Sequence, residues 1–319
     1  DLASLLAIAA PIPLEEPVIN AVFILFIISY GYINSKKKGE IMKYFRLNNG
    51  SKVPAIGFGT FKITEEADME LAIGKAVEEG YRYFDTAKYY ENEKILGKYL
   101  KETGLKREEY QVATKVWPSS FDTDDCKRSL DESLEDLDLG YIDFALLHWY
   151  GKDFDKAWEV FRDYRDQGLV KAIGVCNFSI DQMTELINLG EKPVLDQLES
   201  HLYLQDYKTV EFLKENGILH QAWGPLSQGK SNLLDEKILK EIGDKYGKSP
   251  AQIALKWNID RGTMVLVKSS NEGRIKENIS IFDFDLSQED MNALASLDRK
   301  ERFSNDPENK EWLDKIRRG

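Results

Sequence analysis

The sequence predicts the α/β fold class, in the form of a closed barrel of parallel strands that alternate with helices. After Met42, eight short apolar runs typical of buried strands are separated by longer amphipathic segments. No stretch rich in Pro, Gly or Ser divides this pattern, so it forms a single domain. The chain of 319 residues is long enough for the roughly 250 residues that a (β/α)8 barrel, or TIM barrel, commonly needs.

A short hairpin is predicted just before the barrel. Residues 45–47 and 52–53 flank an Asn-Asn-Gly sequence at positions 48–50. Asn and Gly tolerate the positive φ angles of tight turns. We expect this hairpin to close the bottom of the barrel.

The barrel strands and their helices follow in order. Thr64 is expected to cap the first helix, and the Ser179–Gln182 and Ser249–Gln252 pairs predict capping boxes at two later helices. The expected strands are residues 56–59, 83–85, 111–116, 142–147, 172–175, 195–198, 218–222 and 264–267.

Charge and cysteine content limit the class of protein. The formal net charge of −12 should repel nucleic acid and anionic lipid. The two cysteines, Cys126 and Cys176, lie in contexts that do not suggest pairing. A reducing compartment suits such a chain, and we expect a cytoplasmic protein, either a monomer or a weak dimer.

Residues 1–41 are predicted to be an apolar extension, distinct from the barrel domain at 42–319. Positions 17–34 are almost wholly apolar, and Lys36, Lys37 and Lys38 follow them. One interpretation is a short membrane anchor that leaves the barrel in the cytoplasm. The other is an upstream extension that reflects the choice of start site. Membrane association is expected only under the first.

Reactive side chains fall where the predicted strands end. Asp85 ends the second strand, Tyr90 follows five residues later, Lys115 lies near the end of the third strand, and His148 directly follows the fourth. Catalytic residues of such barrels lie at this carboxyl edge. Each residue alone also has a structural interpretation, but an ammonium inside an apolar strand requires a partner. Asp85 is the obvious one.

Together these four residues suit carbonyl reduction. A nearby ammonium should lower the pKa of Tyr90 and stabilise its phenolate, while Asp85 holds Lys115 in place. Tyr90 would then act as general acid toward a carbonyl oxygen that gains negative charge. His148 could orient that carbonyl by donating a hydrogen bond.

The segments GYRYFDTAKYYENEKILGKYL, TKVW and LLHW occur in this order on separate strands. In this respect the chain resembles the aldo-keto reductases, particularly the bacterial type, from about Lys43 to Phe303. The resemblance implies that Asp85, Tyr90, Lys115 and His148 form the catalytic tetrad. It further implies an oxidoreductase that reduces aldehydes and ketones to alcohols by direct hydride transfer from NADPH.

The cofactor site is expected at the last strands of the barrel, because no GxGxxG sequence supports a dinucleotide-binding domain. Lys268 and Arg274 bracket a Ser-Ser-Asn loop that opens a helix, which is a plausible cradle for a phosphate. The local sequence alone also fits an ordinary solvated helix start. The resemblance favours NADPH here, and it implies as cofactor contacts Lys268, Ser269, Arg274, Glu277, Asn278, Asn177, Gln197, Trp223 and Leu226.

Several positions depart from the family pattern. Cys176 stands where Ser is usual and Asp196 where Asn is commoner. Gly224 replaces a common Ser, Val267 a usual Pro, and Tyr150 a Pro. These changes concern cofactor affinity and leave the tetrad intact.

Aromatic residues near strand ends are predicted to line the substrate mouth, namely Phe61, Trp117, Trp149 and Tyr150. They favour small aldehydes and ketones, and the short tail leans toward reactive aldehydes, dicarbonyls or keto-sugars. No metal is expected, since the three histidines show no metal-ligand spacing. A non-catalytic subunit that binds NADPH on the same barrel remains the alternative.

Overall fold

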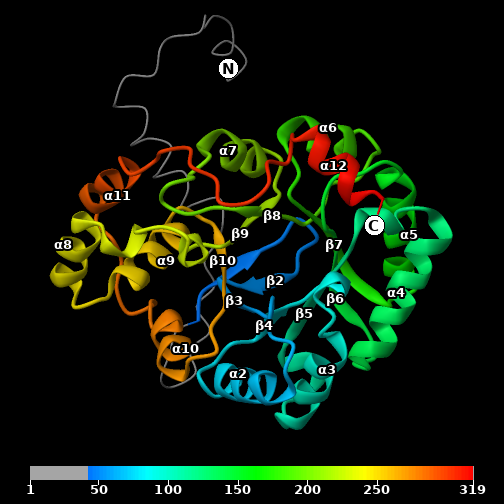
Figure 1. The fold of residues 1–319 in the computed structure, drawn as a ribbon, viewed down its shortest axis with the longest axis horizontal. Helices are drawn as coiled ribbons and strands as arrows, with labels where there is room; N and C mark the ends of the chain where they lie inside the picture. Colours follow the sequence, from blue (N-terminus) through cyan, green and yellow to red (C-terminus); the bar gives the residue numbers. More distant parts are fainter. Residues whose placement is uncertain (1–41, 319) are drawn as a thin grey trace, which may run out of the picture.

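The computed structural model describes residues 42–318, which form a closed barrel surrounded by helices (Figure 1). Eight parallel strands are hydrogen-bonded in the order β10-β3-β4-β5-β6-β7-β8-β9. The ring closes where Val265 of the last strand pairs with Ile56 of the first. The strands are β3 (Ile56–Gly59), β4 (Tyr83–Asp85), β5 (Gln111–Val116), β6 (Ile142–Leu147), β7 (Val170–Cys176), β8 (Leu195–Glu199), β9 (Leu219–Trp223) and β10 (Met264–Val267). The predicted fold is confirmed.

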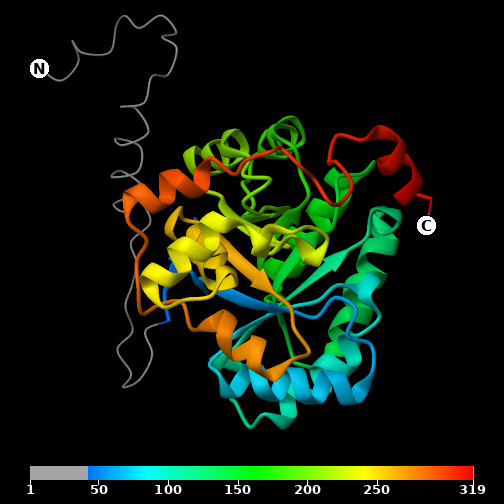
Figure 2. The same ribbon diagram turned by 60° about the vertical axis from the view of Figure 1, so that its left-hand side comes forward.

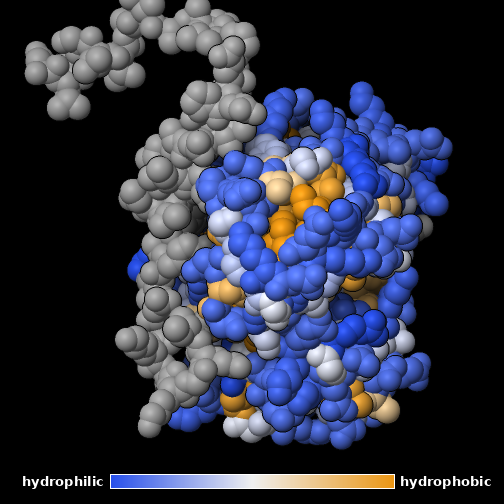
Figure 3. All heavy atoms as spheres, turned by 90° about the vertical axis from the view of Figure 1, so that its left-hand side faces the viewer, coloured by the Kyte–Doolittle hydropathy of each residue, from blue (hydrophilic) through white to orange (hydrophobic). Residues whose placement is uncertain are grey.

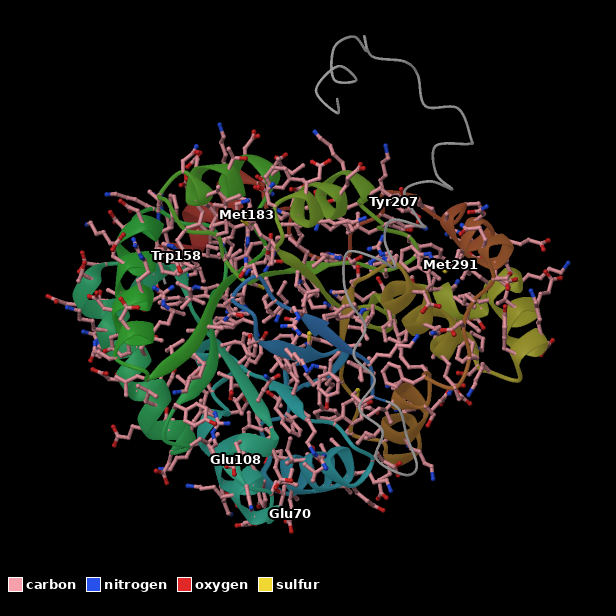
Figure 4. The ribbon with its side chains drawn as sticks, turned by 180° about the vertical axis from the view of Figure 1, so that it is seen from behind. Glu70, Glu108, Trp158, Met183, Tyr207 and Met291 are labelled. Carbon is pink, nitrogen blue, oxygen red and sulfur yellow. The ribbon has the colours of Figure 1, made fainter. Side chains whose placement is uncertain are left out.

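The helices form the outer layer of the molecule (Figures 1 and 4), in which Figure 4 labels Trp158, Met183 and Met291 on α5, α6 and α11. The helices are α2 (Glu66–Glu78), α3 (Glu93–Glu102), α4 (Thr123–Leu137), α5 (Phe154–Asp166), α6 (Ile180–Ile187), α7 (Tyr207–Glu215), α8 (Lys237–Tyr246), α9 (Pro250–Asp260), α10 (Glu272–Ile279), α11 (Gln288–Ala295) and α12 (Lys310–Ile316). Short 3-10 turns include η2 (Lys88–Tyr90), η3 (Arg107–Glu109), η4 (Pro118–Ser120), η5 (Ser227–Gly229) and η6 (Leu233–Asp235).

The predicted hairpin is present as β1 (Tyr44–Arg46) and β2 (Lys52–Pro54), which pair antiparallel. Gly50 in its turn has a φ of 84°, which glycine adopts without steric cost. The Asn48 amide donates to the carbonyl of Pro193, just before β8, at 2.8 Å. Gln111, the first residue of β5, donates to the carbonyl of Lys52 at 2.9 Å. Because both contacts are made at the amino ends of barrel strands, the hairpin covers the end opposite the predicted catalytic edge.

Two of the three predicted helix caps are present in the structure. Both predicted capping boxes form, and Ser179 and Ser249 accept hydrogen bonds from the amides of Gln182 and Gln252. The prediction for Thr64 was wrong, because α2 begins one residue later with Glu65 at its N-cap and no side-chain cap. Acidic residues in the first turn favour this helix start instead, through the helix dipole.

The C-terminal segment passes from α11 by α7 to α12 (Figures 1 and 2). Its path is fixed near α6, where the Gln182 amide donates to the carbonyl of Pro307 at 2.9 Å. On α12, the ring of Trp312 lies 5.7 Å from that of Trp149. The tail is therefore packed against residues that follow β6 and β7.

The face that carries α8, α10 and α11 is mainly hydrophilic, with a few separate apolar areas (Figure 3). Within residues 42–318, no helix combines the length and the apolar composition needed to cross a membrane. The apolar extension predicted at 1–41, with both its interpretations, lies outside the described residues.

Candidate active site

The four residues of the predicted tetrad come together at the carboxyl edge of the barrel. Asp85 ends β4, Lys115 is the fifth of six residues in β5, and His148 follows β6 directly. Tyr90 ends the 3-10 turn η2, between β4 and α3. Parallel strand pairing in register carries these side chains to one place, because adjacent strands end at the same edge.

Lys115 is the centre of this cluster and has no exposed side-chain surface. Its Nζ donates to Asp85 Oδ1 at 2.6 Å and to the carbonyl of Thr86 at 2.8 Å. The Tyr90 hydroxyl lies 3.4 Å from the same nitrogen. A buried ammonium with a carboxylate and a carbonyl as partners is fully compensated. The third N–H of the ammonium is therefore left to face the hydroxyl of Tyr90.

The pKa of Tyr90 differs in direction from the prediction. Burial raises the pKa of this phenol above its usual value of 10.0, and the opposing effect of Lys115 does not cancel it. The prediction that the net pKa is lowered was therefore wrong. Burial acts on Lys115 in the other direction, but Asp85 and Tyr90 beside it raise the pKa of the ammonium overall. At neutral pH the cluster holds a protonated phenol beside a charged ammonium.

His148 presents a neutral ring to this cluster. Burial lowers its pKa well below 6.5, and the charge of Lys115 lowers it further. The ring lies 5.7 Å from that of Tyr90, at an angle of 75°. A neutral imidazole retains one N–H donor, so His148 can still donate a hydrogen bond to an oxygen placed beside Tyr90.

Residues predicted at the nicotinamide carboxamide lie next to the tetrad. Asn177 follows β7 with a φ of 59°, and its amide donates to the carbonyl of His148 at 3.2 Å. Its Oδ1 accepts from the indole nitrogen of Trp223 at 3.0 Å. The side-chain nitrogen Nδ2 of Asn177 also lies 3.1 Å from the sulfur of Cys176. Burial raises the pKa of this thiol well above its usual value, so it is uncharged.

Gln197 connects this group to the tetrad, and it reveals a residue that the sequence reasoning missed. Its Nε2 donates to Asp85 Oδ2 at 2.8 Å and to Gln221 Oε1 at 2.7 Å. Gln221 is fully buried, and it is paired in register with Gln197 across β8 and β9. Because both amide hydrogens of Gln197 are used, its carbonyl oxygen is turned away from them. The available signal for Gln221 was a pair of polar residues, His220 and Gln221, inside a buried strand.

The predicted phosphate cradle lies around the start of α10. Asn271 caps this helix by accepting from the backbone amide of Arg274 at 3.0 Å. Lys268 and Arg274 are exposed, and in the described part of the chain neither has an ion-pair partner. Ser269 is 7% exposed and bonds within the loop. Two unpaired cations at a helix N-terminus fit a phosphate group.

The remaining predicted cofactor contacts, Glu277, Asn278 and Leu226, differ in burial and lie on α10 or in the loop after β9. Glu277 accepts a hydrogen bond from the hydroxyl of Ser249, which ties it to the start of α9. Asn278 is 5% exposed at the inner side of α10. Leu226 is half-buried in the loop after β9, against the hydrophobic core. Gly224 in the same loop has a φ of 63°, which accounts for glycine there in place of the more common serine.

The predicted substrate residues fall into two groups. The ring of Phe61 lies 4.8 Å from that of Tyr90, and the ring of Trp117 lies 4.9 Å from that of His148. Trp149, in contrast, is 5% exposed and packs on α12. Tyr150 lies against Phe154, and its hydroxyl bonds to a glutamate on α6. The first group therefore faces the tetrad, whereas the second supports the tail and the helix layer.

Two further observations complete the chemistry of the site. Among residues 42–318, no group of three His, Cys, Asp or Glu side chains could hold a metal ion. Asp196, next to Gln197, is fully buried, and burial raises its pKa well above the ordinary carboxyl range.

Comparison with known proteins identifies the family of this chain. The model of the aldo/keto reductase family matches residues 55–299. Methylglyoxal reductase DkgA of Salmonella typhimurium is 40% identical over 270 residues, which are 82% of this chain and 96% of that protein. Glyoxal reductase of Bacillus subtilis is 38% identical over 265 residues, or 82% and 95% of the two chains.

Solved structures show the same fold. An aldo-keto reductase from a Medee basin deep-sea metagenome library has a TM-score of 0.81 and 34% identity, and the match covers 83% of this chain and 98% of that one. An aldo/keto reductase of Brucella melitensis has a TM-score of 0.77 and 37% identity, with 81% and 100% covered. With its family model, its relatives and its barrel in agreement, the chain belongs to the aldo/keto reductase family.

Proposed function

We propose that this protein reduces aldehydes and ketones to alcohols by direct hydride transfer from NADPH, with Tyr90 as the general acid. The observation that carries the proposal is the buried Lys115, which lies 2.6 Å from Asp85 and 3.4 Å from the Tyr90 hydroxyl. Such a cluster stabilises a phenolate that forms when a proton leaves.

Substrate binding and proton transfer follow from the positions of these side chains. A carbonyl oxygen placed against the Tyr90 hydroxyl can also accept from the neutral ring of His148. When bound, the reduced nicotinamide supplies the hydride that reaches the carbonyl carbon. Tyr90 gives its proton to the oxygen as negative charge develops there, and the ammonium of Lys115 stabilises the phenolate that remains. The proton is later restored from solvent.

The choice of NADPH rests on charge at the start of α10. Lys268 and Arg274 are both exposed and without ion-pair partners in the described chain, so they are available to a phosphate monoester. An NADH molecule has no such group. At the other end, the ring of Trp223 is held by Asn177 and offers a π face to the nicotinamide, which becomes cationic when it loses hydride.

The relatives suggest which carbonyls to test first. One is named a methylglyoxal reductase and another a glyoxal reductase, so dicarbonyls are included among the proposed substrates. Such small molecules suit a cytoplasmic enzyme, and the formal charge of −12 disfavours a nucleic-acid partner.

The test is steady-state oxidation of NADPH with methylglyoxal, glyoxal and simple aldehydes, for the native protein, Tyr90→Phe and Tyr110→Phe. Tyr110 is also buried, but it lies just before β5 at the opposite edge of the barrel. Loss of the general acid should lower kcat by at least about 10²-fold in Tyr90→Phe, whereas Tyr110→Phe should remain active. A native protein that binds NADPH but reduces none of these carbonyls would instead favour a regulatory subunit that only binds the cofactor.

A further inference from the structure

Exposed aromatic side chains gather beside the proposed proton donor. Among residues 42–318, six large apolar side chains are exposed, and two of them, Phe61 at 44% and Tyr89 at 57%, flank Tyr90 in space or in sequence. Neither ring is part of the hydrophobic core, and each leaves apolar surface exposed to water. Apolar side chains that are exposed as a contiguous patch, rather than singly, commonly mark a place where a ligand binds.

Tyr89 extends this surface through Trp117. Their rings are stacked, with centroids 4.2 Å apart and an interplanar angle of 12°. Trp117 in turn meets the ring of His148 edge-on, at 4.9 Å and 87°. We call Phe61, Tyr89 and Trp117 the aromatic wall. Its ring centroids lie 4.8 Å (Phe61) from the Tyr90 ring, and 4.9 Å (Trp117) and 6.4 Å (Tyr89) from the His148 ring, beside the two groups proposed to hold the carbonyl oxygen.

The wall is held in place from both sides of Tyr89. Lys88, the preceding residue, forms ion pairs with Asp136 at 2.8 Å and with Glu132 at 3.2 Å, both on α4. Tyr90, the following residue, is fixed by the lysine of the tetrad. An aromatic ring that is fixed before binding loses little conformational entropy when a ligand covers it.

The chemistry of the wall points to the shape of the ligand. No hydrogen bond of the Tyr89 hydroxyl is found among the described residues, and the ammonium of Lys62 lies 5.4 Å from the ring centre of Phe61. A dicarbonyl of two or three carbons has little apolar surface with which to cover these ring faces. A carbonyl that is conjugated to an aryl or alkenyl group extends a flat apolar body from the same point.

We infer that the aromatic wall selects aldehydes whose carbonyl is conjugated to a planar group, over short dicarbonyls, and that Tyr89 is a specificity-determining residue. The inference rests on the proposed function and leaves its chemistry unchanged. The aldehyde carbon gains a hydride and its oxygen a proton, while NADPH becomes NADP⁺. Stacking on the wall adds binding free energy that a short dicarbonyl does not gain.

The experiment compares kcat/KM for cinnamaldehyde and benzaldehyde with kcat/KM for methylglyoxal, all with NADPH. The variants are Tyr89→Val, which removes the ring, and Tyr89→Phe, which keeps it. Tyr207→Val is the matched control, because Tyr207 is also an exposed tyrosine, at 49%, but lies in the helix layer at the start of α7 (Figure 4).

In the native protein the ratio of conjugated aldehyde to methylglyoxal should exceed one. Tyr89→Val should lower this ratio by about three- to tenfold, the range expected for loss of one aromatic stack. Tyr89→Phe and Tyr207→Val should leave it within about twofold of native, since neither removes a ring from the wall.

The outcomes separate this inference from the proposed function. A native protein that reduces methylglyoxal with Tyr90-dependent kinetics, but shows a ratio below one or no response to Tyr89→Val, overturns the inference and keeps the function. An equal loss for all carbonyls in Tyr89→Val also overturns it, because Tyr89 would then support the turn rather than select the substrate. A protein that reduces neither class overturns both.

Discussion

The two ends of the proposed cofactor site are built in opposite ways. At the nicotinamide end, Lys115, Gln197 and Asn177 are buried, and each is hydrogen-bonded to other protein groups. At the phosphate end, Lys268 and Arg274 are exposed and have no ion-pair partner in the described chain. A buried network holds its groups in reacting geometry without further reorganisation. Exposed cations attract an anion through their charge, and their side chains adjust when it binds.

This difference suggests that the two ends control different kinetic quantities. Substitutions in the buried network should act mainly on kcat, since they change groups that stabilise the transition state. Substitutions at the exposed end should act mainly on the KM for the cofactor. The predictions below test that division, from the largest expected effect to the smallest.

Lys115→Met should have the largest effect. The change removes the charge that stabilises the phenolate of Tyr90, so kcat should fall by more than about 10²-fold. It also leaves Asp85 buried without its cation, so the free energy of unfolding should fall by about 3 kcal/mol. Steady-state kinetics and urea unfolding measure the two quantities.

Lys101→Met is the matched control for this variant. Lys101 pairs with Asp138 on the surface, where both side chains are largely exposed. Its loss should change unfolding by no more than about 1 kcal/mol. If Lys115→Met were as mild as this control, the buried ion pair would not have the role assigned to it.

Arg274→Ala should act at the other end of the site. Loss of a charge-assisted hydrogen bond to phosphate should raise the KM for NADPH by about 10- to 100-fold. The KM for NADH should change little, because NADH lacks the phosphate. Lys276→Ala, an exposed lysine on the same helix, is the control. An equal effect of Arg274→Ala on both cofactors would argue against a phosphate cradle.

Gln221→Met tests whether the buried network needs its most remote member. The change keeps the side-chain length but removes the oxygen that accepts from Gln197, so the Gln197 amide can rotate. We expect kcat/KM to fall by about five- to tenfold, the equivalent of one hydrogen bond. Met264→Leu replaces the thioether near Gln221 Nε2 with an alkyl group of similar volume, and it should stay within about twofold of native. Equal behaviour of the two variants would remove Gln221 from the positioning network.

The smallest effect concerns pH. Burial lowers the pKa of His148 well below 6.5 and raises that of Tyr90 above 10.0. His148 therefore stays neutral and Tyr90 stays protonated across the neutral range. At saturating NADPH, kcat/KM for the carbonyl should be flat between about pH 6.5 and about 9.5. A loss of rate centred near pH 6.5 would show that His148 titrates at its ordinary value.

Much of this architecture follows from the sequence because its causes are local. Apolar strand runs, the Asn-Asn-Gly turn and the Ser-initiated capping boxes each specify their structure over a few residues. The proximity of the four residues proposed as the tetrad was also predictable, since strand ends of a parallel barrel meet at one edge. The Lys115 side chain demanded a partner, and Asp85 was the acidic residue at a neighbouring strand end.

Other features depend on burial and on contacts between distant strands. The pKa of Tyr90 was predicted to fall from the presence of Lys115 alone, but its net direction depends on how completely the ring is buried. The roles proposed for Gln221 and Tyr89 depend on the register of β8 with β9 and on the orientation of the turn before α3. Neither is encoded in a short motif.

The most direct test of the central claim is a single turnover of methylglyoxal with NADPH that carries deuterium at both C4 positions of the nicotinamide, for the native protein and Tyr90→Phe. The account predicts deuterium on the former carbonyl carbon of the product. It also predicts unchanged NADPH binding in Tyr90→Phe, with a rate lower by at least about 10²-fold. Deuterium lost to solvent, or a Tyr90→Phe rate within threefold of native, would contradict direct hydride transfer with Tyr90 as the proton donor.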